Sequence, residues 1–280
     1  MVNRCLLLLV VTLLHISACG AFLIINRPIR SPSHLGSAAA ESVSIGPIVT
    51  EGDIQIAAEF MVDAFWLNSP QGLVLDESVS ERTKAVLIQQ QADDLQEKYG
   101  ERMGKRSLDT VLIRAVDSST KEILGLVGLE VSLLNKDIGD TLSTTKSDNL
   151  LKNAVASLGP KDRRLYKSAS VQQIATELLP SELEAVAVLS NLVVSPTARR
   201  RGIAQSLCAQ IERVAHAEWG YPTLYLRVER DNAAARTLYE TKLGFSEQYV
   251  LPGAMGVRIK DGSFSVIEAD TLVLCKELAT

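Results

Sequence analysis

The chain has 280 residues, 46% of them hydrophobic and 22% charged, so it can bury a core and is not disordered by composition. The net charge is −4, and the first forty residues hold three arginines and no acid, so the remaining body is acidic, which argues against a nucleic-acid-binding protein. Without that N-terminal segment only one histidine and two cysteines remain, which excludes a Cys/His structural zinc site and a disulfide framework. This composition suits a soluble enzyme.

Residues 1–21 have the layout of a secretory signal peptide, with a short basic start, an apolar stretch over 5–16 and small residues up to Ala21. The apolar stretch has about twelve residues, fewer than the ~20 that a membrane-spanning helix needs. Because apolar residues continue to Ile25, a signal anchor is the alternative.

Residues 22–41 are rich in serine, proline, arginine and small residues, with no acid before Glu41, as in transit peptides. A signal peptide followed by an aromatic residue and such a stretch resembles the bipartite plastid presequence of algae with secondary plastids, with the first cleavage between Ala21 and Phe22. The resemblance implies import into the plastid stroma, a compartment that suits the lack of a disulfide framework. The secretory pathway or a membrane anchor is the alternative location.

A strand and two helices are predicted after the presequence. Residues 42–50 read as the strand, and Asp53 is placed to cap an amphipathic helix. The apolar row of this helix is expected to contain Ile56, Phe60, Met61 and Phe65. A second helix, charged and rich in glutamine, is predicted over 80–99.

A β-hairpin is predicted from strands 111–116 and 123–134, joined by the turn 117–120. Gly125 and Gly128 indicate that another part of the chain closely approaches the second of these strands. Residues 135–182 are polar, with helical pieces over 149–158 and 162–173, and have few large apolar groups. We interpret them as an insertion, because about forty-five such residues cannot hold a core of their own.

The last hundred residues alternate between strands and helices. Residues 185–194 form a nearly continuous apolar run, typical of a strand that is buried on both faces. A helix with Ile203, Leu207, Ile211 and Val214 on one side follows, and then a strand over 223–228. Asp231 or Asn232 is expected to cap a helix over 233–243, which Gly244 ends. Strands over 246–251 and 264–275 complete a mixed α/β chain.

The segment 192-LVVSPTARRRGIAQSL-207 places three arginines between a buried strand and a helix. Backbone N–H groups in such a loop converge on an anion, the helix N-terminus adds a partial positive charge, and arginines add full charges. This pattern predicts a phosphate-binding loop around Gly202. It is neither a nucleoside-triphosphate loop nor a dinucleotide fingerprint. A solvated charge run, a polybasic address and a nucleic-acid contact are the alternatives.

A second motif, 227-RVERDNAAARTLYETKLGF-245, follows about thirty residues later. With the two motifs in this order, the chain resembles the GNAT superfamily of acetyl-CoA-dependent N-acetyltransferases, closely over 185–245 and loosely back to residue 42. The segment 189–204 is similar to plastid members that act on protein N-termini and lysines. The resemblance implies an α/β (α+β) GNAT fold over 42–280, in which a mixed, mostly antiparallel sheet is splayed at a bulge. Helices flank this sheet, and residues 135–182 form a helical insertion between its third and fourth strands.

The resemblance also implies the roles of particular residues. The backbone of Leu192, Val193 and Val194 would pair with the pantetheine arm of acetyl-CoA, and a backbone N–H near Leu192 or Val193 would stabilise the oxyanion. Tyr239 would protonate the departing thiolate and, with Asn232, would face the thioester. No metal is implied. The loop around the pyrophosphate comprises Arg199, Arg200, Arg201, Gly202, Ile203 and Ala204.

Three positions raise questions that the resemblance does not answer. Arg227 occupies the position where several relatives carry a Glu or His base, and it cannot accept a proton. Glu184 and Glu229 are possible substitutes, although each is more typical of a solvated carboxylate. One more residue than usual separates Tyr239 from Gly244, which we expect only to extend the helix end. Cys208 is expected to be a small buried residue.

The sequence therefore predicts acetyl transfer from acetyl-CoA to a primary amine by direct attack. Protein N-termini are the first choice of acceptor, and lysine side chains are a second. A small amine such as a polyamine or amino sugar is an alternative acceptor. A non-catalytic CoA-sensing module is an alternative of another class. We expect no nucleic-acid partner and no stable membrane span in the mature protein.

Overall fold

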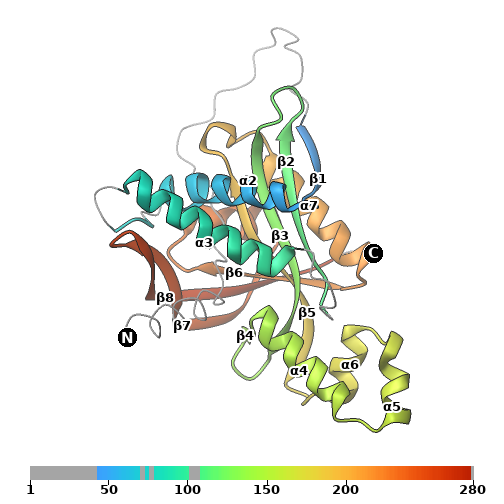
Figure 1. Ribbon diagram of the computed structural model, residues 1–280. Helices are drawn as coiled ribbons and strands as arrows, with labels where there is room; N and C mark the ends of the chain where they lie inside the picture. Colours follow the sequence, from blue (N-terminus) through green and yellow to red (C-terminus); the bar gives the residue numbers. More distant parts are fainter. Residues whose placement is uncertain (1–42, 70–72, 76–78, 101–107, 279–280) are drawn as a thin grey trace, which may run out of the picture.

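The computed structural model describes residues 43–69, 73–75, 79–100 and 108–278. The expected presequence, residues 1–41, lies outside them. An eight-stranded sheet forms the centre, in the order β1-β2-β3-β5-β6-β8-β7 with β4 beside β3 (Figure 1). Among the named strands of the described residues, β5 and β6 are the one parallel pair, so the predicted mixed, mostly antiparallel sheet is confirmed. The strands are β1 Val43–Pro47, β2 Thr110–Asp117, β3 Ile123–Asn135, β4 Asp140–Thr141, β5 Leu183–Val194, β6 Thr223–Glu229, β7 Ser246–Lys260 and β8 Ser263–Glu277.

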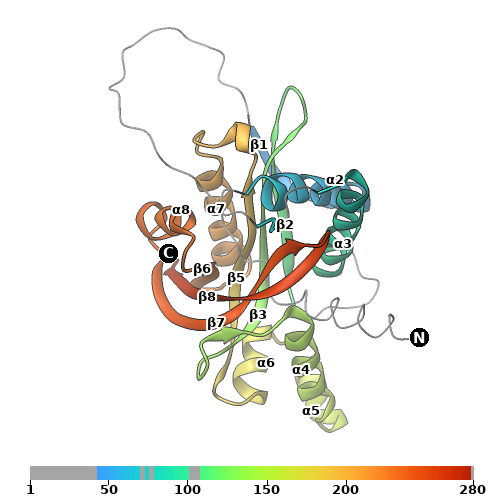
Figure 2. The same ribbon diagram turned by 90° about the vertical axis from the view of Figure 1, so that its left-hand side faces the viewer.

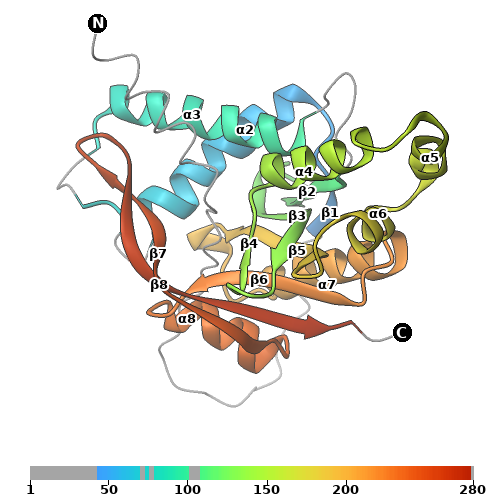
Figure 3. The same ribbon diagram turned by 90° about the horizontal axis from the view of Figure 1, so that it is seen from below.

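Helices cover both faces of the sheet (Figure 3). One face carries α2 (Glu51–Met61), which continues into a π-helical turn (Val62–Leu67), and α3 (Glu81–Tyr99). The other carries α7 and α8, each of which also continues into a π-helical turn. These elements are α7 Ile203–Arg213 with η4 Val214–Glu218, and α8 Ala233–Arg236 with η5 Thr237–Lys242. The central strands therefore lie between two hydrophobic cores.

The start of α2 differs from the prediction. Thr50, not Asp53, is the N-cap residue, since its hydroxyl oxygen accepts a hydrogen bond from the Asp53 backbone N–H at 3.1 Å. Asp53 lies in the first turn, where its carboxylate accepts from the Thr50 hydroxyl and pairs with Arg114. Ile56 is 52% exposed, and the helix buries Ile54, Ala57, Ala58 and Met61 in its place. Met61 and Phe65 of the predicted row are buried and Phe60 packs partly buried against the same core, so Ile56 is the one member that the prediction placed wrongly.

The hairpin of β2 and β3 and the close approach to its glycines are confirmed. A Cβ atom on Gly125 would lie 3.0 Å from Leu207 Cδ1 of α7, and one on Gly128 would overlap the Tyr99 hydroxyl at the end of α3. The two positions point to opposite faces of β3, so each face receives a helix at close range. These contacts fix how α3 and α7 sit against the centre of the sheet.

Residues between β3 and β5 form the short strand β4 and three helices that extend beyond one end of the sheet (Figures 1 and 2). The helices are α4 Thr144–Ala156, α5 Pro160–Leu165 and α6 Val171–Leu178, with the 3₁₀ turns η2 Tyr166–Ser168 here and η3 Pro196–Ala198 after β5. Within the described ranges, no helix is long and apolar enough to cross a membrane.

The last two strands are much longer than predicted and form a twisted hairpin that curls towards α3 (Figure 3). Register shifts between Glu247 and Tyr249 and between Leu251 and Ala254 bend the hairpin. Near its tip, Leu75 donates to the Ile259 carbonyl oxygen at 2.8 Å. The hairpin therefore contributes Val257, Ile259 and Phe264 to the core under α2 and α3.

Candidate active site

Strands β5 and β6 part in the middle of the sheet. Their parallel pairing comprises three pairs and ends at Leu189 and Leu226. Just beyond it, the register of β5 against β3 shifts opposite Leu126–Gly128, and Asn191 adopts a positive φ of 54°. Over the described residues, β5 beyond Leu189 has no further pairing with β6, so one backbone edge is available to an extended ligand. This is the splayed strand that the sequence predicted.

The side chains of the splayed segment point into the two cores. Leu192 and Val194 belong to the core under α7, whereas Val193 belongs to the core under α2 and α3. All three are at most 2% exposed. The segment can therefore offer mainly its backbone to a ligand, as the resemblance to the GNAT superfamily implies, although Val194 also lines the pocket described below.

The loop after β5 turns sharply into α7. Arg200 and Gly202 both have positive φ angles, of 70° and 78°. A Cβ atom on Gly202 would meet nothing within 4 Å, so its backbone conformation is what favours glycine there. The backbone N–H groups at the start of α7, including those of Ile203 and Ala204, lack partners within the helix and can bind an anion.

A pocket of about 170 Å³ lies at this helix start. It joins the end of β5, the first turn of α7 and the π-helical turn η5. Gln205, Thr237 and Lys242 line it, although the sequence did not single them out. The full lining is Val194, Ala198, Arg200, Gly202, Ile203, Ala204, Gln205, Thr237, Leu238 and Lys242.

The three consecutive arginines differ in position. Arg200 lines the pocket. The guanidinium of Arg199 turns back and donates to the Val194 carbonyl oxygen at 3.3 Å, and its burial lowers its pKa. Arg201 is exposed and does not line the pocket. Arg199 is thus placed to hold the loop against β5, and Arg200 to contact a ligand.

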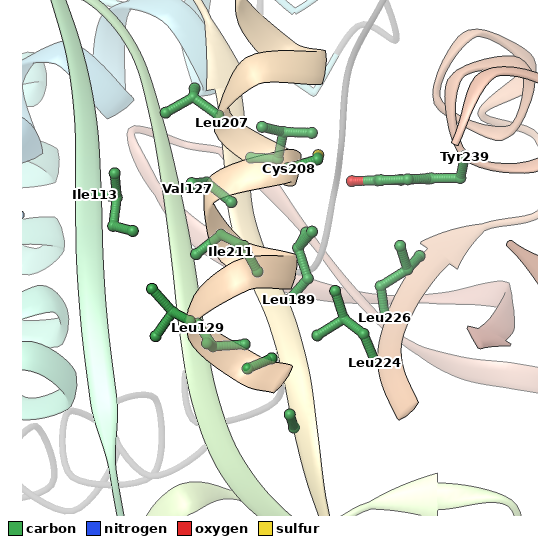
Figure 4. Close-up of a cluster of buried hydrophobic side chains, with 14 of the residues drawn as sticks. Ile113, Val127, Leu129, Leu189, Leu207, Cys208, Ile211, Leu224, Leu226 and Tyr239 are labelled. Carbon is green, nitrogen blue, oxygen red and sulfur yellow. The ribbon is translucent and has the colours of Figure 1, made fainter. Parts of the chain in front are cut away.

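Asn232 and Tyr239 are both buried beside the sheet, at 2% and 1% exposure. The Asn232 side chain caps α8 by accepting from the Ala235 backbone N–H at 3.0 Å. The Tyr239 ring packs edge-on against Phe245, with centroids 5.6 Å apart, and points towards Cys208 of α7 (Figure 4). Asn232 therefore has a structural function as a helix cap. Tyr239, on the helix of the second motif, points towards α7, which begins in the first motif.

The additional residue after Tyr239 does not simply extend the helix. The chain widens into a π-helix over Thr237–Lys242, and the Leu243 N–H donates to the Leu238 carbonyl oxygen at 3.0 Å. Because π-helical bonds span five residues instead of four, the turn holds one more residue within the same length. The expectation of a longer helix end was wrong.

Residues 173–245 match the model of the acetyltransferase (GNAT) family. The matched region begins in α6 and contains the splayed strand, the arginine loop and the helix of Tyr239. The chain contains a GNAT acetyltransferase domain. Its enzyme class is therefore N-acetyltransferase, as the two motifs predicted.

Similarity to individual acetyltransferases extends over most of the chain. GCN5-related N-acetyltransferase 7, chloroplastic, from Arabidopsis thaliana is 25% identical over 237 residues, which cover 81% of this chain and 76% of that protein. Arabidopsis thaliana NAA60, solved in complex with acetyl-CoA, is 17% identical with a TM-score of 0.46 and covers 85% of this chain and 99% of its own. Spermidine/spermine N-acetyltransferase SpeG from Vibrio cholerae, solved with manganese ions, is 15% identical with a TM-score of 0.44 and covers 84% of this chain and 92% of its own.

The three positions considered in connection with a general base have different surroundings. Arg227 is 5% exposed, and its guanidinium pairs with Asp140 of β4 at 3.2 Å. Both oxygens of Glu229 accept from Arg258, at 2.8 and 2.7 Å, so Glu229 is a structural ion pair and not a solvated carboxylate. Glu184 is exposed near the start of β5, opposite Leu134 and five residues before the end of the β5–β6 pairing.

Cys208 is fully buried on the face of α7 that packs against the sheet. Burial raises the pKa of its thiol far above the ordinary range, so it stays protonated and cannot serve as a nucleophile. The prediction of a small core residue is confirmed.

A polar network that the sequence did not indicate lies on the opposite face of β5. The Tyr99 hydroxyl at the end of α3 lies 2.8 Å from Ser190 Oγ and accepts from Asn191 Nδ2 at 3.0 Å. Burial raises the pKa of the Tyr99 phenol well above its usual range, so it remains neutral. Ser190 and Asn191 are the two polar residues within the buried run of β5, which was the available signal.

Proposed function

We propose that this GNAT domain transfers the acetyl group of acetyl-CoA to primary amines, with protein N-termini as the main acceptors and lysine side chains as a second class. The observation that carries the proposal is the pocket that joins the free edge of β5, the first turn of α7 and the helix of Tyr239. The family match over the same segments supports acetyl transfer.

The residues present suit acetyl-CoA. The backbone of Leu192–Val194 offers donors and acceptors along an unpaired edge, where a pantetheine amide can bind as an added strand does. The N–H groups at the start of α7 suit a pyrophosphate, and Arg200 and Lys242 add positive charge to the same pocket.

The reaction proceeds by direct attack. A neutral amine forms the new C–N bond at the acetyl carbonyl, and a backbone N–H near Leu192 or Val193 stabilises the oxyanion. When the C–S bond breaks, the Tyr239 hydroxyl donates its proton to the thiolate. A tyrosine hydroxyl carries a proton at neutral pH and so can act as this donor. The amine loses its own proton to water, and the Tyr239 oxygen regains a proton from water, so that the protein returns to its starting state.

The lack of a base at Arg227 supports N-termini as acceptors. An α-amino group has a pKa of about 7.7–8.0, against about 10.4 for lysine, so a much larger fraction is neutral at pH 7–8. An N-terminal substrate therefore reacts without strong assistance from the protein.

We also propose that the protein acts in the plastid. The chloroplastic name of the Arabidopsis relative and the transit-like composition of residues 22–41 support this location. A fluorescent fusion to residues 1–41 should enter the plastid, and secretion of that fusion would contradict the proposal.

The activity is tested by incubating the purified protein with acetyl-CoA and a mixed peptide library. One half of the library has free N-termini and blocked lysines, and the other half has the reverse. Mass spectrometry should find acetylation mainly at N-termini. Turnover of spermidine without any peptide modification would overturn the proposal in favour of a small-amine enzyme.

A further inference from the structure

The Asn191 amide at the bulge of β5 has an unused hydrogen-bond acceptor. The side chain is 1% exposed, and its Nδ2 donates to the Tyr99 hydroxyl. Its Oδ1 is buried and, among the described residues, has no hydrogen-bond partner. Buried polar atoms without partners are rare because they are costly, so such an atom points to a ligand that completes it.

The surrounding residues fix the orientation of this amide. Tyr99 accepts from Nδ2 and also contacts Ser190, so the Asn191 nitrogen faces α3 and Oδ1 is directed elsewhere. Gly128 of β3 leaves the room that the Tyr99 hydroxyl occupies, since any Cβ there would overlap it. Three segments far apart in the sequence thus hold one amide in place.

This amide lies where the acceptor must arrive. Asn191 directly precedes Leu192, in the segment proposed to bind the thioester, and lies just beyond the last β5–β6 pair. Tyr239 belongs to the core under α7, whereas Tyr99 at the end of α3 contacts Ser190 on the other face of β5. With the leaving thiolate assigned to the Tyr239 side, the attacking amine is assigned to the Tyr99 side, where the Asn191 amide is held.

We propose that Asn191 Oδ1 accepts a hydrogen bond from an N–H of the acceptor amine and thereby directs the amine lone pair at the acetyl carbonyl. Tyr99 is a positioning residue that holds the amide in the required orientation. This inference rests on the proposed acetyl transfer to amines. It specifies an acceptor whose nitrogen has a free lone pair for the carbonyl and an N–H that can donate to Asn191 at the moment of attack. A neutral primary amine meets both requirements.

An uncharged amide suits this task better than a carboxylate. A carboxylate would stabilise the ammonium form of the acceptor and raise its pKa, and so would lower the reactive fraction at neutral pH. The amide accepts the same hydrogen bond without a full charge. The charged residues described on this face include Asp94, Lys98 and Glu130, together with Arg227 and its partner Asp140 and with Glu229 and its partner Arg258.

The test compares four variants with the wild-type protein, using the library peptide that it acetylates fastest. Asn191→Gly keeps the positive φ without strain and removes the amide. It should lower kcat/KM for the peptide about tenfold, the effect of one lost hydrogen bond of ordinary strength, with an unchanged KM for acetyl-CoA. Tyr99→Phe should lower it less. Tyr166→Phe, a matched control, removes a hydroxyl that bonds Glu177 outside the site and should change nothing.

Asn191→Asp gives a readout that a purely structural residue would not affect. The acceptor oxygen remains, but the added negative charge should shift the acid limb of the kcat/KM pH profile to higher pH. Unchanged peptide kinetics in Asn191→Gly, or an equal rise in both KM values with a lower Tm, would overturn the inference and leave the proposed function intact. A wild-type protein that acetylates no amine would overturn both.

Discussion

Two tyrosines lie against β5 from opposite faces, and their surroundings differ. Tyr239 sits in an apolar core, packed against Phe245 and close to Cys208. Tyr99 sits in a polar network with Ser190 and Asn191. On the Tyr239 face the groups proposed to bind a ligand are mainly backbone N–H and C=O groups, whereas on the Tyr99 face they are side chains.

This difference follows from what each face must recognise. Acetyl-CoA is the same for all acetyltransferases of this kind, so a backbone edge and a helix start can serve as its site whatever the side chains nearby. Acceptors vary, and side chains from α3, β3, β4 and β6 surround the acceptor face. The groups on the Tyr239 face therefore come from one continuous segment of the sequence. The groups on the Tyr99 face come from segments that are far apart in the sequence.

The largest effect is expected from Tyr239→Phe, which removes the proton donor and keeps the ring against Phe245. We expect kcat to fall about a hundredfold, at the lower end of general acid catalysis, while the Kd for acetyl-CoA stays unchanged. Steady-state kinetics and calorimetry measure the two quantities. An unchanged kcat would favour a CoA-sensing module over an enzyme.

On the opposite face, Gly128→Ala should disturb the network by displacing the Tyr99 hydroxyl. The overpacking should cost about 1–3 kcal/mol of unfolding free energy, measured in urea. The loss should shrink in a Tyr99→Ala background, where the clash with the ring is gone and only the contact with the Ser190 hydroxyl remains. Gly46→Ala is the matched control, because a Cβ there meets nothing within 4 Å. Equal losses in the two backgrounds would contradict the contact.

The arginine loop allows a comparison between neighbouring residues. Arg200→Ala should raise the KM for acetyl-CoA roughly tenfold, as expected for loss of a charge-assisted hydrogen bond, and leave the KM for the peptide unchanged. Arg201→Ala, next to it but outside the pocket, should have little effect. Equal effects of the two substitutions would mean that charge density, and not position in the pocket, determines binding.

The smallest effect concerns Asp53 at the start of α2. Hydrogen bonds from Thr50 and Arg114 lower the pKa of its carboxyl group. Its stabilisation is therefore fully present above the ordinary carboxyl pKa of about 3.9 and is lost as pH falls through the lower folded-state pKa. Asp53→Asn should cost less than about 1 kcal/mol at pH 7, since the pair is partly solvated.

Urea unfolding at pH 7 and pH 2 checks this prediction, with the exposed Glu59→Gln as control. The difference between Asp53→Asn and wild type should shrink at the lower pH. A difference of the same size at both values would show that the carboxylate charge plays no part.

The sequence predicted the parts of the fold that depend on hydrophobic pattern. The apolar run of β5 and the row from Ile203 to Ile211 were sufficient to place the central strand and α7. The N-cap residue of α2 was harder to predict, since Thr50 and Asp53 are both residue types that favour this position. The length of the β7–β8 hairpin depends on its contacts near residues 74 and 259, which no local pattern contains.

The candidate site was predictable to the extent that it is contiguous. The arginine loop and Tyr239 lie within one pair of motifs, so the sequence could indicate both. The different orientations of Arg199 and Arg200 depend on backbone angles of the loop, which cannot be read from a run of three identical residues. Tyr99 is separated from Ser190 by 91 residues. The link between them was hidden because α3 reads as an ordinary charged helix.

The π-helical turn of Thr237–Lys242 also has a consequence for how the chain tolerates changes in length. Because the additional residue is absorbed within a single turn, Asn232 at one end and Gly244 at the other keep their capping and turning functions. The segment between Tyr239 and Gly244 can therefore differ in length by one residue while the helix start and the turn after the helix are kept.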